Sequence, residues 1–206
     1  TTDNDSANFL VSQNTAVVSE NGSVSDNFSV VLTSEPTANV TLTVSDNDSS
    51  EVLFSPTSLV FSKDNWSVAQ WVTLTGKDDN VSDDNQSTLL TLSLSSVDSK
   101  YDNSSLSPKT VVVTTTDNDS ANFLVSQSTA VVSENGSVSD NFSVVLTSEP
   151  TSTVTVTVTL SDNGSSEVLF PSSSRFGSDN WSTAQWVILT GVDDNVSDDN
   201  QTTTLT

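Results

Sequence analysis

This chain of 206 residues carries a formal net charge of −22, with five basic residues against 27 acidic ones. Such a charge repels nucleic acid and anionic membrane surfaces, so we expect no nucleic acid partner and no membrane insertion. Cysteine, histidine and methionine are absent, which excludes disulfides, thiolate or imidazole metal sites, and Ser-His or Cys-His catalysis. Any metal must therefore be held by oxygen, and calcium is the cation that fits.

The sequence repeats itself with an offset of 114 residues. Residues 1–37 recur at 115–151 with a single difference, Asn14 against Ser128. A period of that length is a whole domain rather than one turn of a solenoid. We therefore divide the chain into the end of a preceding repeat or linker at 1–5, a first repeat at 6–116, an acidic linker at 117–119 and a second repeat at 120–206.

Short apolar runs separated by turn residues follow in chain order. Residues 9–11 and 16–18 predict a first strand that is broken in the middle. Alternating apolar residues predict further strands, which fall at 28–32, 40–44, 52–54, 71–75, 90–94 and 111–113, whereas Leu59 and Phe61 lead into a loop. About seven short strands per copy are typical of an immunoglobulin-like sandwich. The predicted fold class is all-β, with tandem sandwiches arranged end to end.

The second copy is less regular after Pro150. It stops at Thr206, inside the strand that matches residues 90–94, so the sequence given holds no match for the last strand or the closing acidic residues. An open sandwich edge is an aggregation hazard. We therefore expect further copies of this repeat to complete it, either later in the same chain or head to tail from a neighbouring molecule.

Acidic residues gather in the turns and at the strand ends of both copies. Aspartate is favoured in turns for its own sake, and solvated turn residues are therefore one interpretation. The other is calcium binding, because alternate turns of a sandwich meet at one end and few basic residues are available to neutralise the carboxylates. An EF-hand is excluded, since Asp46-Asn47-Asp48 lacks the glycine and the glutamate that follow in such a loop.

Four segments of the first copy carry a family resemblance: SEPTANVTLTVS, SEVLFSPTSLVFSKDNW, VTLTGKDDNVSDDNQ and TDND. The chain resembles the Calx-beta repeats, first described in sodium–calcium exchangers and common in large bacterial surface proteins. The resemblance implies a seven-stranded sandwich with calcium bound at one end, beside the linker to the next domain. By position, it implies the ligands Glu20, Asp46, Asp78, Asp79, Asp83, Asp117 and Asp119, and in the second copy Glu134, Asp162, Asp193, Asp194 and Asp198.

Asparagine usage is the second unusual feature. Of 19 asparagines, 16 stand in an Asn-x-Ser/Thr triplet with x other than proline. Such triplets are good turns, but they are also the acceptors of N-linked glycans on secreted proteins. We predict glycans at many of these positions: Asn4, Asn21, Asn27, Asn39, Asn47, Asn65, Asn80, Asn85, Asn103, Asn118, Asn135, Asn141, Asn163, Asn180, Asn195 and Asn200.

Each copy contains two tryptophans in the motif Asn-Trp-Ser-x-Ala-Gln-Trp. A tryptophan beside a strand is usually part of the core, although exposed aromatics can also form a platform for sugars. We predict that Trp71 and Trp186 are core residues. Trp66 and Trp181, each next to a triplet asparagine, are expected to pack against the first sugar of a glycan.

These patterns favour a structural, non-enzymatic module of an extracellular or cell-surface stalk or filament. Calcium would make the acidic linkers rigid, and glycans would cover the lateral surface. An adhesin whose repeats bind a surface glycan or a protein ligand is the alternative. A glycosidase with two carboxylates is disfavoured, because near-identical copies make poor active sites and every acidic cluster has a turn explanation.

Overall fold

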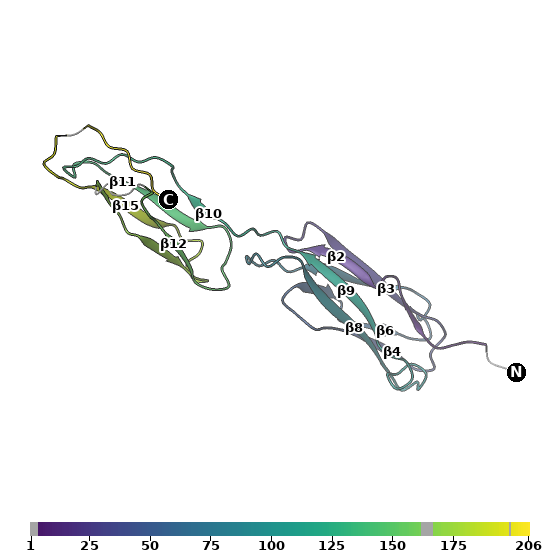
Figure 1. The fold of residues 1–206 in the computed structure, drawn as a ribbon. Coiled ribbons are helices and arrows are strands. Elements are labelled where there is room, and N and C mark those ends of the chain that lie inside the picture. The colour runs from purple at the N-terminus through teal and green to yellow at the C-terminus, as the bar shows by residue number, and fades with distance from the viewer. Residues whose placement is uncertain (1–3, 162–166, 198) are drawn as a thin grey trace. The chain divides into compact units, whose positions relative to one another are not determined.

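The computed structural model describes residues 4–161, 167–197 and 199–206 (Figure 1). Across those residues it consists of 15 strands joined by turns and loops, without a helix. The described part therefore also contains no helix that is long and apolar enough to cross a membrane. The predicted all-β fold class is confirmed. Backbone contacts divide the chain into two compact units, Thr1–Asp79 with Asp83–Asn118, and Asn80–Ser82 with Asp119–Thr206.

The first unit is built from two sheets. One has the order β1-β3-β7-β5 and the other has the order β2-β9-β8-β4-β6. Every pairing is antiparallel except that of β2 with β9. The strands are β1 (Phe9–Val11), β2 (Thr15–Ser19), β3 (Ser25–Leu32), β4 (Val40–Asp46), β5 (Val52–Ser55), β6 (Ser58–Phe61), β7 (Gln70–Gly76), β8 (Gln86–Ser96) and β9 (Lys109–Thr116).

The core of the first unit follows from the alternation along its strands. In β3, Phe28, Val30 and Leu32 are buried while the residues between them are not. A period of two places every second side chain on the same face of a sheet, so the inner faces of both sheets form one apolar cluster. Burial of each such side chain contributes about 1.5–3 kcal/mol to the stability of the unit.

The broken first strand serves both sheets. Its first half, β1, pairs with β3, whereas its second half, β2, pairs in parallel with β9. Leu59 and Phe61, expected to lead into a loop, are buried members of β6. The first unit therefore has nine strands where the sequence predicted about seven.

The prediction that Trp71 and Trp186 are core residues is wrong. Trp71 is 56% exposed and Trp186 is 60% exposed. The reason is strand parity, since Val72 and Leu74 of β7 face the core and Trp71 must therefore face out. Trp66 packs against the core cluster from the loop before β7.

The second unit contains six strands in its described residues. They form a sheet of order β10-β11-β15-β13 and a separate β12-β14 pair. The strands are β10 (Phe123–Val125), β11 (Ser139–Leu146), β12 (Val154–Thr157), β13 (Val168–Leu169), β14 (Ser173–Phe176) and β15 (Gln185–Gly191). Its buried cluster centres on Val158, Val187 and Leu189 and is smaller than that of the first unit.

Candidate metal centre

One end of the first unit collects carboxylates because of the parallel pairing of β2 with β9. These strands finish side by side, with Ser19 opposite Thr116. The residues that follow, Glu20 and Asp117, are therefore neighbours, and their carboxylate oxygens lie within 4.8 Å of each other. The backbone continues this contact, since Glu20 N–H donates to Thr116 O at 3.2 Å.

The loop before β8 folds around the carboxylate of Asp117. The Oδ2 atom of Asp117 accepts the backbone N–H groups of Asp83 at 3.1 Å and Asp84 at 3.0 Å. Asp84 has a φ of 64°, a left-handed conformation that is uncommon outside glycine and turns the backbone sharply. Asn85 completes the contact by accepting the N–H of Asp117 at 3.2 Å through its Oδ1 atom.

Glu20 is the buried member of this group, with 3% of its surface exposed. Its pKa is raised to about 7, mainly by burial and further by the charges of Asp79, Asp117 and Asp83, although a hydrogen bond from Asn118 N–H opposes the shift. The charges that act on Glu20 are thus negative, whereas buried carboxylates normally have a cationic partner. A bound cation would supply the missing charge.

Two further oxygens at this end are buried without a hydrogen-bond partner among the described residues. They are Oε2 of Glu51 and Oδ1 of Asp83. Glu51 is 7% exposed and precedes β5, and its backbone oxygen accepts the N–H of Lys77 and the hydroxyl of Thr115. A buried oxygen without a partner costs about 1–3 kcal/mol. Such oxygens, like the carboxylates around them, are ligands that calcium prefers.

The second unit groups the corresponding residues. Carboxylate oxygens of Glu134, Glu167 and Asp194 all lie within 4.8 Å of one another. By sequence match these residues correspond to Glu20, Glu51 and Asp79. Here Glu134 is exposed, and Glu167 and Asp194 are partly buried.

The structure brings only some of the ligands predicted from the sequence close to one another. In the first unit the charges of Asp79, Asp83 and Asp117 act on Glu20, and in the second unit Glu134 and Asp194 belong to one carboxylate group. Asp46 ends β4 opposite Leu90 and is partly buried. Asp78 and Asp193 are exposed, Asp119 is partly buried at the start of the second unit's main range, and Asp162 and Asp198 lie outside the described residues.

Glu51 and Glu167 were missed by the sequence analysis. Both stand in the repeated segment Ser-Ser-Glu-Val-Leu-Phe, directly before a strand. A charged residue repeated next to a strand that enters the core was the available signal.

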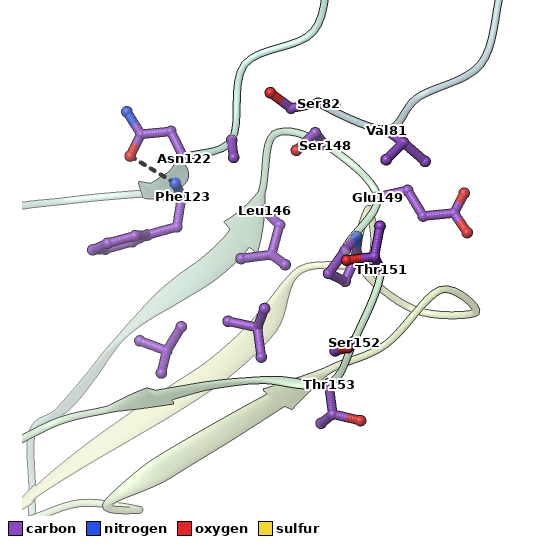
Figure 2. Close-up of a pocket in the computed structure, with 14 residues that line it drawn as sticks. Val81, Ser82, Asn122, Phe123, Leu146, Ser148, Glu149, Thr151, Ser152 and Thr153 are labelled. Carbon is purple, nitrogen blue, oxygen red and sulfur yellow. Dashed lines mark hydrogen bonds between the residues drawn. The ribbon is translucent and has the colours of Figure 1, made fainter. Parts of the chain in front are cut away.

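The second unit also contains an open pocket, drawn in Figure 2. Its lining is mostly aliphatic, hydroxyl-bearing and aromatic, with Phe123 and Leu146 among the apolar members and Glu149 as the one carboxylate. The carboxylate of Glu149 points away from Phe123 and Leu146 (Figure 2). The pocket therefore does not present the two facing carboxylates that glycoside hydrolysis requires.

No family model and no curated protein matches the chain. Among solved structures it is similar to the calcium binding domain CBD12 of CALX1.1, with 17% identity, a TM-score of 0.39 and coverage of 88% of this chain and 74% of that one. It is also similar to the chaperone–tip adhesin complex of CFA/I fimbriae, with 11% identity, a TM-score of 0.41 and coverage of 97% and 94%.

A third similar structure is the MSP family member WR4 of C. elegans, with 7% identity, a TM-score of 0.35 and coverage of 52% of this chain and 95% of that one. The resemblance to Calx-beta repeats predicted from the sequence thus has a counterpart among solved structures. At these identities and TM-scores the likenesses carry no argument about function.

Proposed function

We propose that the chain is a structural, non-enzymatic repeat module of an extracellular, glycosylated stalk or filament. In this proposal calcium binds the carboxylates at the end of the first unit and stiffens the linker at residues 117–119. The supporting observation is Glu20, which is buried among Asp79, Asp83 and Asp117 with only negative charges acting on it. A divalent cation would turn this arrangement from a cost into a stabilising contact.

Calcium titration of the full chain tests the metal site, with Glu20→Gln as the variant and Asp78→Asn as its matched control. Glutamine removes the buried charge at nearly constant size, whereas Asp78 is an exposed carboxylate of the same acidic end. We expect the affinity for calcium to fall at least about tenfold, or about 1.4 kcal/mol, in Glu20→Gln, and to change little in Asp78→Asn. Absence of calorimetric heat with the unmodified chain, or equal affinities of both variants, would refute the site.

The stiffening is tested by removing the ion. With a chelator, both units should stay folded by circular dichroism, while small-angle scattering should show a broader range of separations between them. If calcium does not stiffen the linker, the scattering curves with chelator and with calcium will be the same. That result would refute the mechanical role.

Glycosylation is the second part of the proposal, and the hydrogen bonds of the candidate asparagines suggest an order in which to test them. In Asn65 and Asn180 the side-chain nitrogen donates to the backbone oxygens of Val60 and Arg175, so the atom that would carry the sugar is already used by the fold. Side-chain oxygens are used as acceptors in Asn21, Asn47, Asn85, Asn103 and Asn135. Asn163 lies outside the described residues.

Asn27, Asn39 and Asn141 are exposed, and their side-chain amides make no hydrogen bond within the described part of the chain. The same holds for Asn4, Asn80, Asn118, Asn195 and Asn200, and we therefore expect glycans first at these eight positions. Glycopeptide mass spectrometry of native material measures the occupancy of each asparagine. A native mass equal to the 21.7 kDa of the bare chain would refute glycosylation.

A further inference from the structure

The outer face of the β1-β3-β7-β5 sheet holds an unexplained aromatic side chain. Trp71 is 56% exposed and lies near the start of β7, one of the two central strands of this sheet. Its neighbours across and along the sheet are small, since Trp71 pairs with Ser29 and the next outward residue of β7, Thr73, lies between Asn27 and Ser55. Neither Ser29 nor Thr73 is large enough to cover the indole, so its flat face is open to a ligand.

The residue beside Trp71 on this face is a glycan acceptor. Asn27, Phe28 and Ser29 form an Asn-x-Ser triplet inside β3. Strand parity sends Phe28 into the core and Asn27 and Ser29 outward. Because Ser29 is opposite Trp71 and Asn27 is opposite Thr73, Asn27 and Trp71 are diagonal neighbours on one face, about 7–8 Å apart at their backbones.

The second unit repeats this arrangement. Ser143 is opposite Trp186 and Asn141 is opposite Ile188, and Trp186 is 60% exposed. The triplet Asn141-Phe142-Ser143 again stands on β11, and the tryptophan on β15. The pairing of acceptor and tryptophan therefore does not depend on the strands that only the first unit has.

The chemistry of the two side chains is complementary. A glycan on Asn27 would be attached through an amide nitrogen that is free of other hydrogen bonds in the described chain and points outward. A pyranose presents several C–H groups on one face, and an indole offers a large flat apolar surface against which such a face can pack. The first sugar lies within reach of the indole, because a diagonal pair is already close enough for long side chains to touch.

We propose that the first pyranose of an N-linked glycan on Asn27 stacks on the indole of Trp71, and that Asn141 and Trp186 form the same pair in the second unit. The proposal rests on the glycosylation proposed above. It assigns the exposed tryptophans to a ligand carried by the chain itself. It also moves the sugar platform from Trp66, which packs against the core, to Trp71.

The test uses the full chain secreted by a glycosylating eukaryotic host, with its glycans trimmed enzymatically to the first sugar. Glycopeptide mass spectrometry first establishes whether Asn27 is occupied. Nuclear magnetic resonance then records the sugar C–H protons, which move upfield when they lie over an aromatic ring. We expect upfield signals that disappear in Trp71→Ala and in Asn27→Gln but persist in Leu53→Ala, an exposed apolar residue of the same face.

Thermal unfolding supplies a second readout. Asn27→Gln should lower the unfolding midpoint of the glycosylated chain by a few degrees, a typical consequence of losing a contact of order 1 kcal/mol. The same substitution should have no further effect in the Trp71→Ala background, because the pair acts as a unit. In protein made without glycans, Asn27→Gln should leave the midpoint unchanged.

The outcomes separate the two proposals. An unoccupied Asn27 in both the host-made and the native protein refutes glycosylation at this site and the stacking with it. An occupied Asn27 whose sugar signals ignore Trp71→Ala refutes stacking and leaves glycosylation standing. Fluorescence changes of unglycosylated protein on addition of free oligosaccharide, abolished by Trp71→Ala, would instead assign this face to an outside ligand and overturn the proposal.

Discussion

The carboxylate of Asp117 accepts the backbone N–H of Asp83 at 3.1 Å, which ties the end of β9 to the loop before β8. Both residues also raise the pKa of Glu20 through their negative charge. The hydrogen bond that orients Asp117 thus holds two like charges close to a buried third one. Without a bound cation, three carboxylates held close together do not stabilise the folded protein. For this reason we interpret the arrangement as a cation site.

The pH dependence of stability should reveal Glu20 when calcium is removed. Its pKa is raised from 4.5 to about 7 by folding, so between these values the folded state binds a proton that the unfolded state has lost. The free energy of unfolding should therefore fall as the pH rises from 4.5 to 7, by at most about 3 kcal/mol.

Urea unfolding in chelator, at a series of pH values, measures this slope. Glu20→Gln serves as the control, since glutamine does not titrate and should remove the descending part of the profile. If the free energy of unfolding of the unmodified protein does not fall between pH 4.5 and 7, and its profile matches that of Glu20→Gln, then Glu20 does not have the raised pKa. With calcium present, affinity should weaken as the pH falls below about 7, because protons compete with the ion for Glu20.

Gly76→Ala should destabilise the first unit by about 1–3 kcal/mol. A Cβ atom at Gly76 would lie 2.2 Å from the backbone oxygen of Ser19, and neither strand end can give way cheaply. Since Ser19 precedes Glu20, the shift should also weaken calcium binding. Denaturant unfolding and calcium titration check both effects, and Thr73→Ala, at an exposed position of the same strand, should change neither. If Gly76→Ala is as stable as the unmodified chain, then Gly76 and the backbone of Ser19 are not in close contact in solution.

Asp98→Asn should cost the first unit about 1–3 kcal/mol. The Asp98 carboxylate is buried and accepts the backbone N–H groups of Thr37 at 2.8 Å and Lys100 at 3.0 Å, and these bonds, that of Thr37 foremost, lower its pKa. Its contribution is therefore present above the ordinary aspartate pKa and is lost as the pH falls through the lowered value.

Unfolding at neutral and at acidic pH tests this contribution. The difference between the Asp98→Asn variant and the unmodified chain should shrink as the pH drops below the ordinary aspartate range. Asp64→Asn is the control, because Asp64 forms an exposed ion pair with Lys63 that contributes little. A difference that stays constant with pH would mean that packing, and not the charge, makes Asp98 important.

The two tryptophans of the first unit should respond in opposite ways to truncation. In protein made without glycans, Trp66→Ala should lose about 2–4 kcal/mol, because this partly buried ring packs against the core. Trp71→Ala should stay within about 0.5 kcal/mol of the unmodified chain, because its ring stands outside the sheet. Denaturant unfolding of both variants measures these losses. A large loss of unfolding free energy in Trp71→Ala would mean that Trp71 is a core residue after all.

Much of the fold could be predicted from the sequence, because strand alternation is a local property. The alternation of Phe28, Val30 and Leu32 with polar neighbours predicts β3 and its buried face, as observed. The same parity would have placed Trp71 outside, had it been counted from Val72 and Leu74. The prediction from residue size was wrong because parity, and not size, decides which face of a sheet a strand residue occupies.

The candidate site could be predicted only in part. Repeated acidic residues at strand ends indicated Glu20, Asp79, Asp83 and Asp117. Which of them meet depends on strand pairing, since Glu20 and Asp117 are neighbours through the parallel contact of β2 with β9. Glu51 was missed because its burial is a consequence of that same assembled end.

The segment Thr-Ala-Val-Val-Ser shows where local sequence stops deciding structure. It occurs identically at residues 15–19 and 129–133, and in the first unit it forms β2, with Ala16 and Val18 buried. In the second unit the same five residues form no strand. The sequence by itself determined a segment able to form a half-buried strand. The tertiary structure decided whether the strand exists, because its ladder bonds come from β9, almost 100 residues further along the chain, and the described second unit has no such neighbour.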